Sequence, residues 1–167
     1  AGDSLAVVSG KNITVSGSGI SLEMGTATLA AAGNVNIGAA TETHVDNAQE
    51  QHSHSNVGSR SEVASSSSTT TTLSQGSTVS ADAVTIASGK DIKVAGSTIV
   101  GTNDVSLSAA HDVIITTTQD TQSASTSYQK HDSGFGAGGG IGISYGSQKQ
   151  TDTANTSTVT NTGSTVG

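Results

Sequence analysis

The sequence predicts an all-β protein built as a parallel β-helix, a solenoid in which short strands stack on one another. Three observations predict it: a repeat of about 21 to 22 residues, short segments that alternate apolar and polar residues, and a shortage of bulky side chains. Aromatic residues make up 2% of the 167 residues, and there is no Cys, Pro or Trp. A core of thin Val, Ile, Leu and Ala layers suits stacked strands, because β-branched side chains fit a pleated surface.

The strongest repeat is a five-residue pattern in which Asn or Asp precedes an apolar–any–apolar step. It occurs at residues 11–15, 33–37, 90–94 and 111–115. Corresponding positions lie 22 residues apart in the first half (35 − 13 = 22) and 21 apart in the second (113 − 92 = 21). Alternation with a period of two predicts strands, and no segment has the spacing of an amphipathic helix. Equal spacing predicts that the four strands occupy the same place in successive rungs.

A weaker apolar–any–apolar step precedes each strong one at the same spacing. Alternate residues of a strand point to opposite sides, so the apolar residues of both sets are expected to face inward. The predicted core consists of Leu5, Val7, Ile13, Val15, Leu29, Val35, Ile37, Val84, Ile86, Ile92, Val94, Val105, Leu107, Val113 and Ile115.

The Asn or Asp of each pattern is expected in the turn that enters a strand. These residues are Asn12, Asn34, Asp91 and Asp112. Their side chains can bond the local backbone, and both residue types tolerate the left-handed conformation.

A larger repeat contains these coils, because Ser9-Gly10-Lys11 returns as Ser88-Gly89-Lys90 after 79 residues (88 − 9 = 79). The predicted organisation is coils of unit 1 at 1–38, a polar insertion at 39–75, coils of unit 2 at 76–115, a second insertion at 116–162, and the start of a third unit at 163–167. Each unit therefore holds about two coils followed by one long insertion.

Both insertions are rich in Ser and Thr, and the second is also rich in Gly. Composition alone would fit a linker or a disordered segment. We favour long two-stranded β-hairpins that project from the solenoid, because each insertion leaves and re-enters the coil at the same phase. Isolated ribbons are marginal in water, so the hairpins should lie along the solenoid or pair with neighbouring hairpins. Their tips are expected near 54–59 and 133–140.

Candidate chemistry is sparse. Residues 134–139 match G-x-G-x-x-G, but no helix pattern follows, so we interpret them as a glycine-rich hairpin tip. His52 and His54 would share one face of a strand near His44, as two metal ligands would, but a solvated polar ribbon explains them better. Asp91 and Asp112 hold equivalent turn positions and do not indicate a glycosidase pair. We therefore expect no catalytic residue, no cofactor site and no metal site.

The net charge of −7 and a pI near 4.9 argue against nucleic acid as a partner. The stretches 89–99 (GKDIKVAGSTI) and 108–117 (SAAHDVIITT), each followed by a Ser/Thr-rich insertion, resemble the haemagglutinin repeats of filamentous haemagglutinin-type exoproteins. That group includes the large exoproteins of contact-dependent growth inhibition. The resemblance implies a right-handed parallel β-helix in a secreted, cell-surface virulence protein, exported by two-partner secretion through an outer-membrane transporter.

Three functions are compatible with this resemblance. The chain could be a structural segment of an adhesin or toxin-delivery stalk, with a possible part in crossing the target outer membrane. It could bind a target-cell receptor or glycan directly through the aromatic residues of the second insertion, Tyr128, Phe135 and Tyr145. It could also self-associate through β edges, since long Ser/Thr/Gly strands of low charge pair readily.

Overall fold

The computed structural model describes residues 3–137 and 142–167, and every regular element in them is a strand. The all-β prediction is therefore confirmed. No helix long and apolar enough to cross a membrane occurs in this part of the chain. The chain divides into two compact units. The coil unit comprises the residues up to Glu42, Thr72–Asp120 and Val159–Gly167, and the hairpin unit comprises Thr43–Thr71 and Thr121–Thr158.

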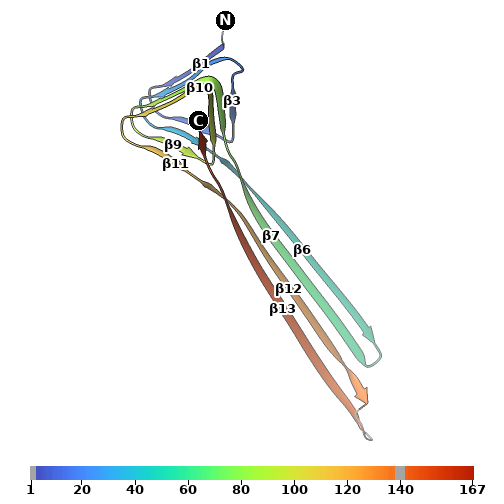
Figure 1. The fold of residues 1–167 in the computed structure, drawn as a ribbon. Helices are drawn as coiled ribbons and strands as arrows, with labels where there is room; N and C mark the ends of the chain where they lie inside the picture. The colour runs from blue at the N-terminus through green and yellow to red at the C-terminus, as the bar shows by residue number, and fades with distance from the viewer. Residues whose placement is uncertain (1–2, 138–141) are drawn as a thin grey trace. The chain divides into compact units, whose positions relative to one another are not determined.

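One parallel sheet of the coil unit has the strand order β1-β4-β8-β10-β14, and β3 also pairs with β8 (Figure 1). The strands are β1 (Asp3–Ser9), β3 (Gly19–Ser21), β4 (Gly25–Ala31), β8 (Thr78–Ser88), β10 (Thr98–Ala109) and β14 (Thr165–Val166). The weaker apolar steps stack in register here, so that Leu29 pairs with Val7 on one side and Ile86 on the other.

A second parallel sheet contains the four strong patterns in the order β11-β9-β5-β2. Its strands are β2 (Ile13–Ser16), β5 (Val35–Gly38), β9 (Ile92–Ala95) and β11 (Val113–Thr116). Ile13 pairs with Val35, Val35 with Ile92, and Ile92 with Val113. This register confirms the spacings of 22 and 21 residues. It also joins Val35 to Ile92 across 57 residues (92 − 35 = 57), so the first insertion does not interrupt the stack.

The core of the coil unit follows the same columns of side chains. Completely or almost completely buried members of the expected core are Ile13, Leu29, Val35, Ile37, Val84, Ile86, Ile92 and Val94. Val79 and Ile99, which were not expected there, are also fully buried. Half-buried members of the expected core, packed against the buried ones or beside them, are Leu5, Val7, Val15, Val105 and Leu107.

Val113 and Ile115 depart from the expected core, because their exposed fractions are 44% and 51%. Both lie on β11, the edge strand of its sheet, and none of the described strands stacks on their outer side. Sequence alternation correctly identifies the inward face, but burial also requires a rung on both sides.

Three of the four turn residues, Asn12, Asn34 and Asp91, bond to the next rung and not within their own turn as expected. Asn12 Oδ1 accepts from the Asn34 N–H at 2.9 Å, and Asn34 Oδ1 accepts from the Asp91 N–H at 3.2 Å. Asp91 Oδ1 in turn accepts from the Asp112 N–H at 3.2 Å. None of these residues adopts a positive φ. The reason is geometric: identical turns stacked in register place each side chain beside the next rung's backbone, where it satisfies an N–H outside the strand ladder.

Both insertions form the remaining sheet, of order β13-β12-β7-β6, whose strands run side by side in Figure 1. The first hairpin consists of β6 (Ala40–Asn56) and β7 (Ser59–Gln75), with its turn at Val57 and Gly58. The second consists of β12 (Thr118–Ala137) and β13 (Ile143–Thr162). The expectation that neighbouring hairpins pair with each other is confirmed, because β7 and β12 are adjacent strands.

Candidate functional site: the paired hairpins

The paired hairpins present a long exposed surface rich in polar side chains. Every side chain of the two outer strands, β6 and β13, is exposed, and the inner strands β7 and β12 are at most half-buried in the described residues. Ser, Thr and Gln dominate these strands, and such side chains keep their hydrogen bonds with water when no second layer covers them. The hairpin sheet therefore presents hydroxyl, amide and main-chain groups for hydrogen bonding.

Each hairpin is closed at its base by a serine hydroxyl. Ser77 follows β7, and its Oγ donates to the Gly38 carbonyl at 2.6 Å, just before β6 begins. Ser164 follows β13, and its Oγ donates to the Thr116 carbonyl at 2.6 Å, just before β12 begins. The two strands of each insertion are thus tied together where the chain leaves and re-enters the coil.

The same serines form a ladder between rungs. Ser77 Oγ accepts from the Ser18 N–H at 3.3 Å, Ser97 Oγ accepts from the Ser77 N–H at 3.1 Å, and Ser164 Oγ accepts from the Ser97 N–H at 3.3 Å. Ser77 and Ser97 are almost fully buried. Sequence reasoning missed this ladder, although the recurring Gly-Ser-Thr at 76–78, 96–98 and 163–165 was the signal that could have revealed it.

The two hairpins contact each other near the base of the sheet through Ser74 on β7. The Ser74 N–H donates to Asp120 Oδ1 at 2.6 Å, and Ser74 Oγ donates to the Gln119 carbonyl at 3.1 Å. A carboxylate is a strong acceptor for a backbone N–H, so this contact helps to set the register of one hairpin against the other.

Further along the sheet, Ser61 Oγ donates to Asp132 Oδ1 at 2.6 Å. Asp132 also forms an ion pair with Lys130 at 2.8 Å. The hydrogen bonds from Lys130 and Ser61 lower the pKa of Asp132 below its ordinary value, and the bond to Asp132 raises the pKa of Lys130. Both groups are open to solvent, so the pair contributes more to register than to stability.

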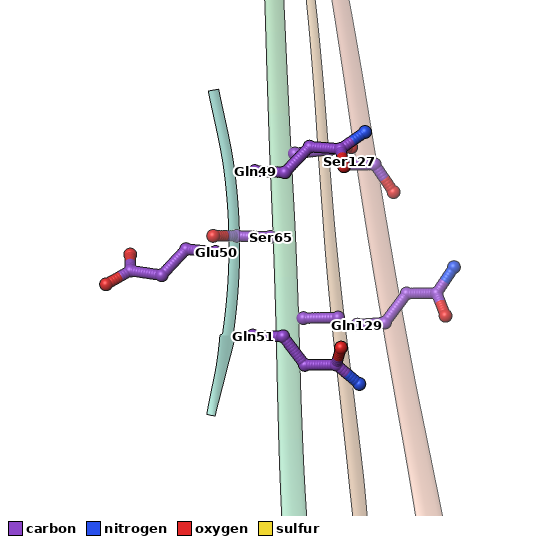
Figure 2. A pocket seen from close by; sticks show the side chains of 8 residues that line it. Gln49, Glu50, Gln51, Ser65, Ser127 and Gln129 are labelled. Carbon is purple, nitrogen blue, oxygen red and sulfur yellow. The ribbon is translucent and has the colours of Figure 1, made fainter. Parts of the chain in front are cut away.

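A depression lies on the hairpin sheet among β6, β7 and β12 (Figure 2). Figure 2 shows the side chains of Gln49 and Gln51 on one side of β6, and the Glu50 side chain extending to the other. The lining residues are Gln49, Glu50, Gln51, Ala64, Ser65, Ser66, Ser127 and Gln129. Neutral amides and hydroxyls predominate there, so the depression is suited to hydrogen-bonding partners.

The aromatic residues of the second insertion do not form one cluster. Phe135 and Tyr145 make an edge-to-face contact with ring centroids 5.3 Å apart, and each is 64% exposed. The Phe135 N–H also donates to the Gly58 carbonyl in the turn of the first hairpin, at 3.1 Å. Tyr128 is half-buried on β12, seven residues before Phe135 (135 − 128 = 7). The structure therefore brings together two of the three residues proposed as partner contacts.

Two of the three histidines of the first insertion, His44 and His52, pair with carboxylates on their own strand. His44 Nε2 lies 3.1 Å from Asp46 Oδ1, and His52 Nε2 lies 2.7 Å from Glu50 Oε1. Within residues 3–137 and 142–167, no group of three or more His, Cys, Asp or Glu side chains could hold a metal ion.

The glycine-rich match at 134–139 falls partly within β12, which includes Gly134 and Gly136. A dinucleotide-binding turn would leave a strand and open a helix, whereas these two glycines lie inside a strand. Gly138 and Gly139 lie outside the described residues.

The hemagglutinin repeat family matches residues 57–167. A tRNA nuclease CdiA of Burkholderia pseudomallei is 57% identical over 166 residues, which are 99% of this chain and 13% of that protein. The tRNA nuclease CdiA-2 of Burkholderia pseudomallei strain 1026b is 56% identical over 99% of this chain and 5% of its own length.

The chain therefore spans a small part of the length of these relatives. The family match covers most of the sequence, and the identity extends over nearly all of it. The resemblance found in the sequence is confirmed: the chain belongs to the hemagglutinin repeat family of secreted, cell-surface exoproteins.

Proposed function

We propose that this chain is a structural segment of a stalk, in which the coils close into a right-handed parallel β-helix and the insertions project from it as hairpins. The observation that carries the proposal is the register of β5 on β9, which continues the stack across the first insertion. Each rung adds about 4.8 Å, so many units in series make a long rod. We assign the coils to 1–38 and 76–115, the insertions to 39–75 and 116–162, and the opening of a third unit to 163–167.

The stalk would serve a longer exoprotein that leaves its cell through an outer-membrane two-partner secretion transporter. In that protein it holds an adhesive or toxic part at a distance, where a target-cell receptor or glycan is met, and its hairpins aid passage across the target outer membrane. The relatives are named tRNA nucleases, and we assign any nuclease activity to residues outside this segment. The segment itself takes no part in catalysis and needs no cofactor.

Hydrogen exchange on this chain tests the proposed solenoid. Slow exchange is expected for the coil strands, because their N–H groups lie between two rungs, and faster exchange is expected for the outer hairpin strands. Exchange in β5 and β9 as fast as in an unfolded chain would contradict the β-helix.

The role in delivery is tested in a full-length relative by deleting the segment equivalent to 39–75. The deletion should leave fibre length unchanged, because the stack does not pass through the insertion. Loss of target-cell killing or adhesion at unchanged length would support a functional hairpin, whereas unchanged activity would restrict this hairpin to a passive role.

Direct binding is a second candidate, favoured by the exposed contact between Phe135 and Tyr145. Paired aromatic rings offer apolar faces and one hydroxyl, which suits the faces of sugar rings. A glycan-array signal that disappears with Tyr145→Ala and persists with Tyr128→Ala would support this function. No signal from the unmodified chain on the array would argue against it.

A further inference from the structure

The free ends of the two hairpins carry apolar side chains at one end of a mostly polar sheet (Figure 1). Phe135 on β12 and Tyr145 on β13 make their edge-to-face contact there, and a Cβ added to Gly58 in the turn of the first hairpin would lie 3.1 Å from the Phe135 ring. Val57 in the same turn and Ile143 at the start of β13 are 108% and 84% exposed. Val57, Phe135, Ile143 and Tyr145 are called the apolar tip.

The rest of the hairpin unit is polar by contrast. In its described residues, Val45 on β6 is the one other large apolar side chain that is more than half exposed, at 52%. Contiguous exposed apolar side chains rimmed by polar residues mark a site for a protein, a ligand or a membrane. The tip lies at the hairpin ends, and a further strand would pair along an edge of the sheet, so neighbours beside β6 or β13 would not cover it.

The hairpin ends also lack acidic side chains. Residues 51–61 and 133–151 contain no Asp or Glu, although the chain has 13 such residues and a net charge of −7. Arg60 and Lys149 are the Lys and Arg residues of these two ranges. Arg60 is exposed and lies 3.5 Å from Glu62, and an exposed ion pair of this length is weak enough for Arg60 to bind another anion. The hairpin ends therefore carry positive charge within an acidic chain.

Both cations lie behind the tip on the face that carries the aromatic rings. The Phe135 N–H donates to the Gly58 carbonyl, and Arg60 follows Gly58 by two residues, so Arg60 shares the face of Phe135. Lys149 follows Tyr145 by four residues on β13 and shares the face of that ring (149 − 145 = 4). At about 3.4 Å per residue, Arg60 lies about 7 Å and Lys149 about 14 Å behind the aromatic rings.

This order of groups matches the surface of an anionic lipid bilayer. Elements that lie in such a surface bury apolar side chains about 5–10 Å deep, at the boundary of acyl chains and headgroups, which is close to the distance between the aromatic rings and Arg60. Tyrosine rings favour this boundary, and Lys and Arg are attracted to anionic headgroups. A sugar would instead need hydrogen-bonding side chains beside the rings, and Val57 and Ile143 provide none.

We propose that the apolar tip is a lipid-binding site that enters the surface of an anionic membrane. Arg60 and Lys149 then meet the phosphate groups of the lipids, and the Ser/Thr-rich strands behind them stay in water. This inference rests on the proposed role of the hairpins at the target outer membrane and names the part of them that meets lipid.

A single introduced tryptophan tests this site, because the chain has no tryptophan of its own. Tyr145→Trp places the probe in the tip, and Tyr128→Trp, the same substitution on β12 away from the tip, is the matched control. With vesicles of phosphatidylcholine and phosphatidylglycerol, emission from Tyr145→Trp should shift to shorter wavelength and be quenched by brominated acyl chains. Emission from Tyr128→Trp should not change. Equal responses of the two variants, or no response from Tyr145→Trp, would overturn the proposal.

Vesicle co-sedimentation measures how strongly the chain binds. Val57→Ser should weaken binding about tenfold, because one apolar side chain fewer leaves water, whereas Val45→Ser should leave binding unchanged. Equal effects of these two substitutions would refute the tip as the lipid site. Arg60→Gln should weaken binding to vesicles that contain phosphatidylglycerol and have little effect with phosphatidylcholine alone, and added salt should remove this difference. Equal effects of Arg60→Gln on both kinds of vesicle would refute the role of anionic headgroups.

Sedimentation velocity without vesicles and a glycan array identify other partners of the tip. Self-association or sugar binding that Val57→Ser abolishes, in a chain that binds no vesicle, would assign the tip to a second copy or a glycan and refute the lipid site. The delivery role would survive that result if deletion of the segment equivalent to 39–75 stops target-cell killing. Vesicle binding together with unchanged killing after that deletion would support the lipid site and refute the delivery role of this hairpin, so the two proposals fail separately.

Discussion

Truncation of Ile37 tests whether the register of the coil unit creates its stability. Ile37 is fully buried, and it pairs with Val15 on one side and Val94 on the other. Ile37→Ala removes three carbon atoms, worth about 2.4 kcal/mol at about 0.8 kcal/mol per buried CH2 group. The cavity left between two rungs adds to this cost, so we expect a loss of about 3 to 4 kcal/mol in the free energy of unfolding.

Ile115→Ala is the matched control. Ile115 stands at the end of the same column, paired with Val94, but its side chain is 51% exposed on the edge strand. Because the side chain is only half buried, its burial contributes about half of the transfer free energy, and its removal leaves no closed cavity. We therefore expect a loss of about 1 kcal/mol in the free energy of unfolding.

Urea unfolding followed by far-ultraviolet circular dichroism gives both values, provided that the dependence on urea concentration is the same for the two variants. Equal losses of unfolding free energy for Ile37→Ala and Ile115→Ala would refute the reasoning. Such a result would mean that a rung on each side of the residue does not determine how much its side chain stabilises the coil.

Three further predictions concern the hairpin bases, the turns and the hairpin register. Ser77→Ala should lower the free energy of unfolding by about 1 kcal/mol, measured in urea, because the Ser18 N–H and the partly buried Gly38 carbonyl both lose a hydrogen bond. Gly96→Ala should lower the free energy of unfolding, measured by thermal unfolding, by about 1 kcal/mol or more, because Gly96 has a positive φ and lies against the Thr118 side chain. Gly19→Ala is the control and should cost less, because an added Cβ there meets open space. In an NMR titration, Asp132→Asn should return the raised pKa of Lys130 towards its ordinary value, and an unchanged pKa would contradict the ion pair. The folded pKa of Asp132 lies below its ordinary value, so its small contribution to stability is present at pH values above the ordinary pKa and is lost as the pH falls through the folded pKa. The folded pKa of Lys130 is raised, so its contribution to stability is present below the ordinary pKa and is lost as the pH rises through the raised pKa.

Much of the coil unit could be predicted from sequence, because its strands are defined by patterns of a few residues that repeat along the chain. The spacing between Ile13 and Val35 sets which residues pair across rungs, and alternation sets which of them face inward. The same reasoning predicts the hairpin character of the insertions, since a segment that leaves and returns at one phase must double back.

The hydrogen-bond partners of the turn residues could not be predicted in this way. Asn34 has an ordinary turn sequence, and a bond to its own backbone would satisfy the same propensity. Only the stacked rungs show that its side chain reaches the Asp91 N–H on the next rung. Likewise, Ser77 is one serine among many in the sequence, and burial beside the Gly38 carbonyl distinguishes it.

The sequence by itself determined the strands, their period and the inward face of each rung, because these depend on backbone geometry and on side chains a few residues apart. Tertiary structure alone decided which of those faces are buried and how the two hairpins meet. Val113 has the same pattern as Val35 but lies on an edge strand, so its exposure depends on a neighbour that no local pattern records. The pairing of β7 with β12 joins residues far apart in the chain, so no local pattern records it.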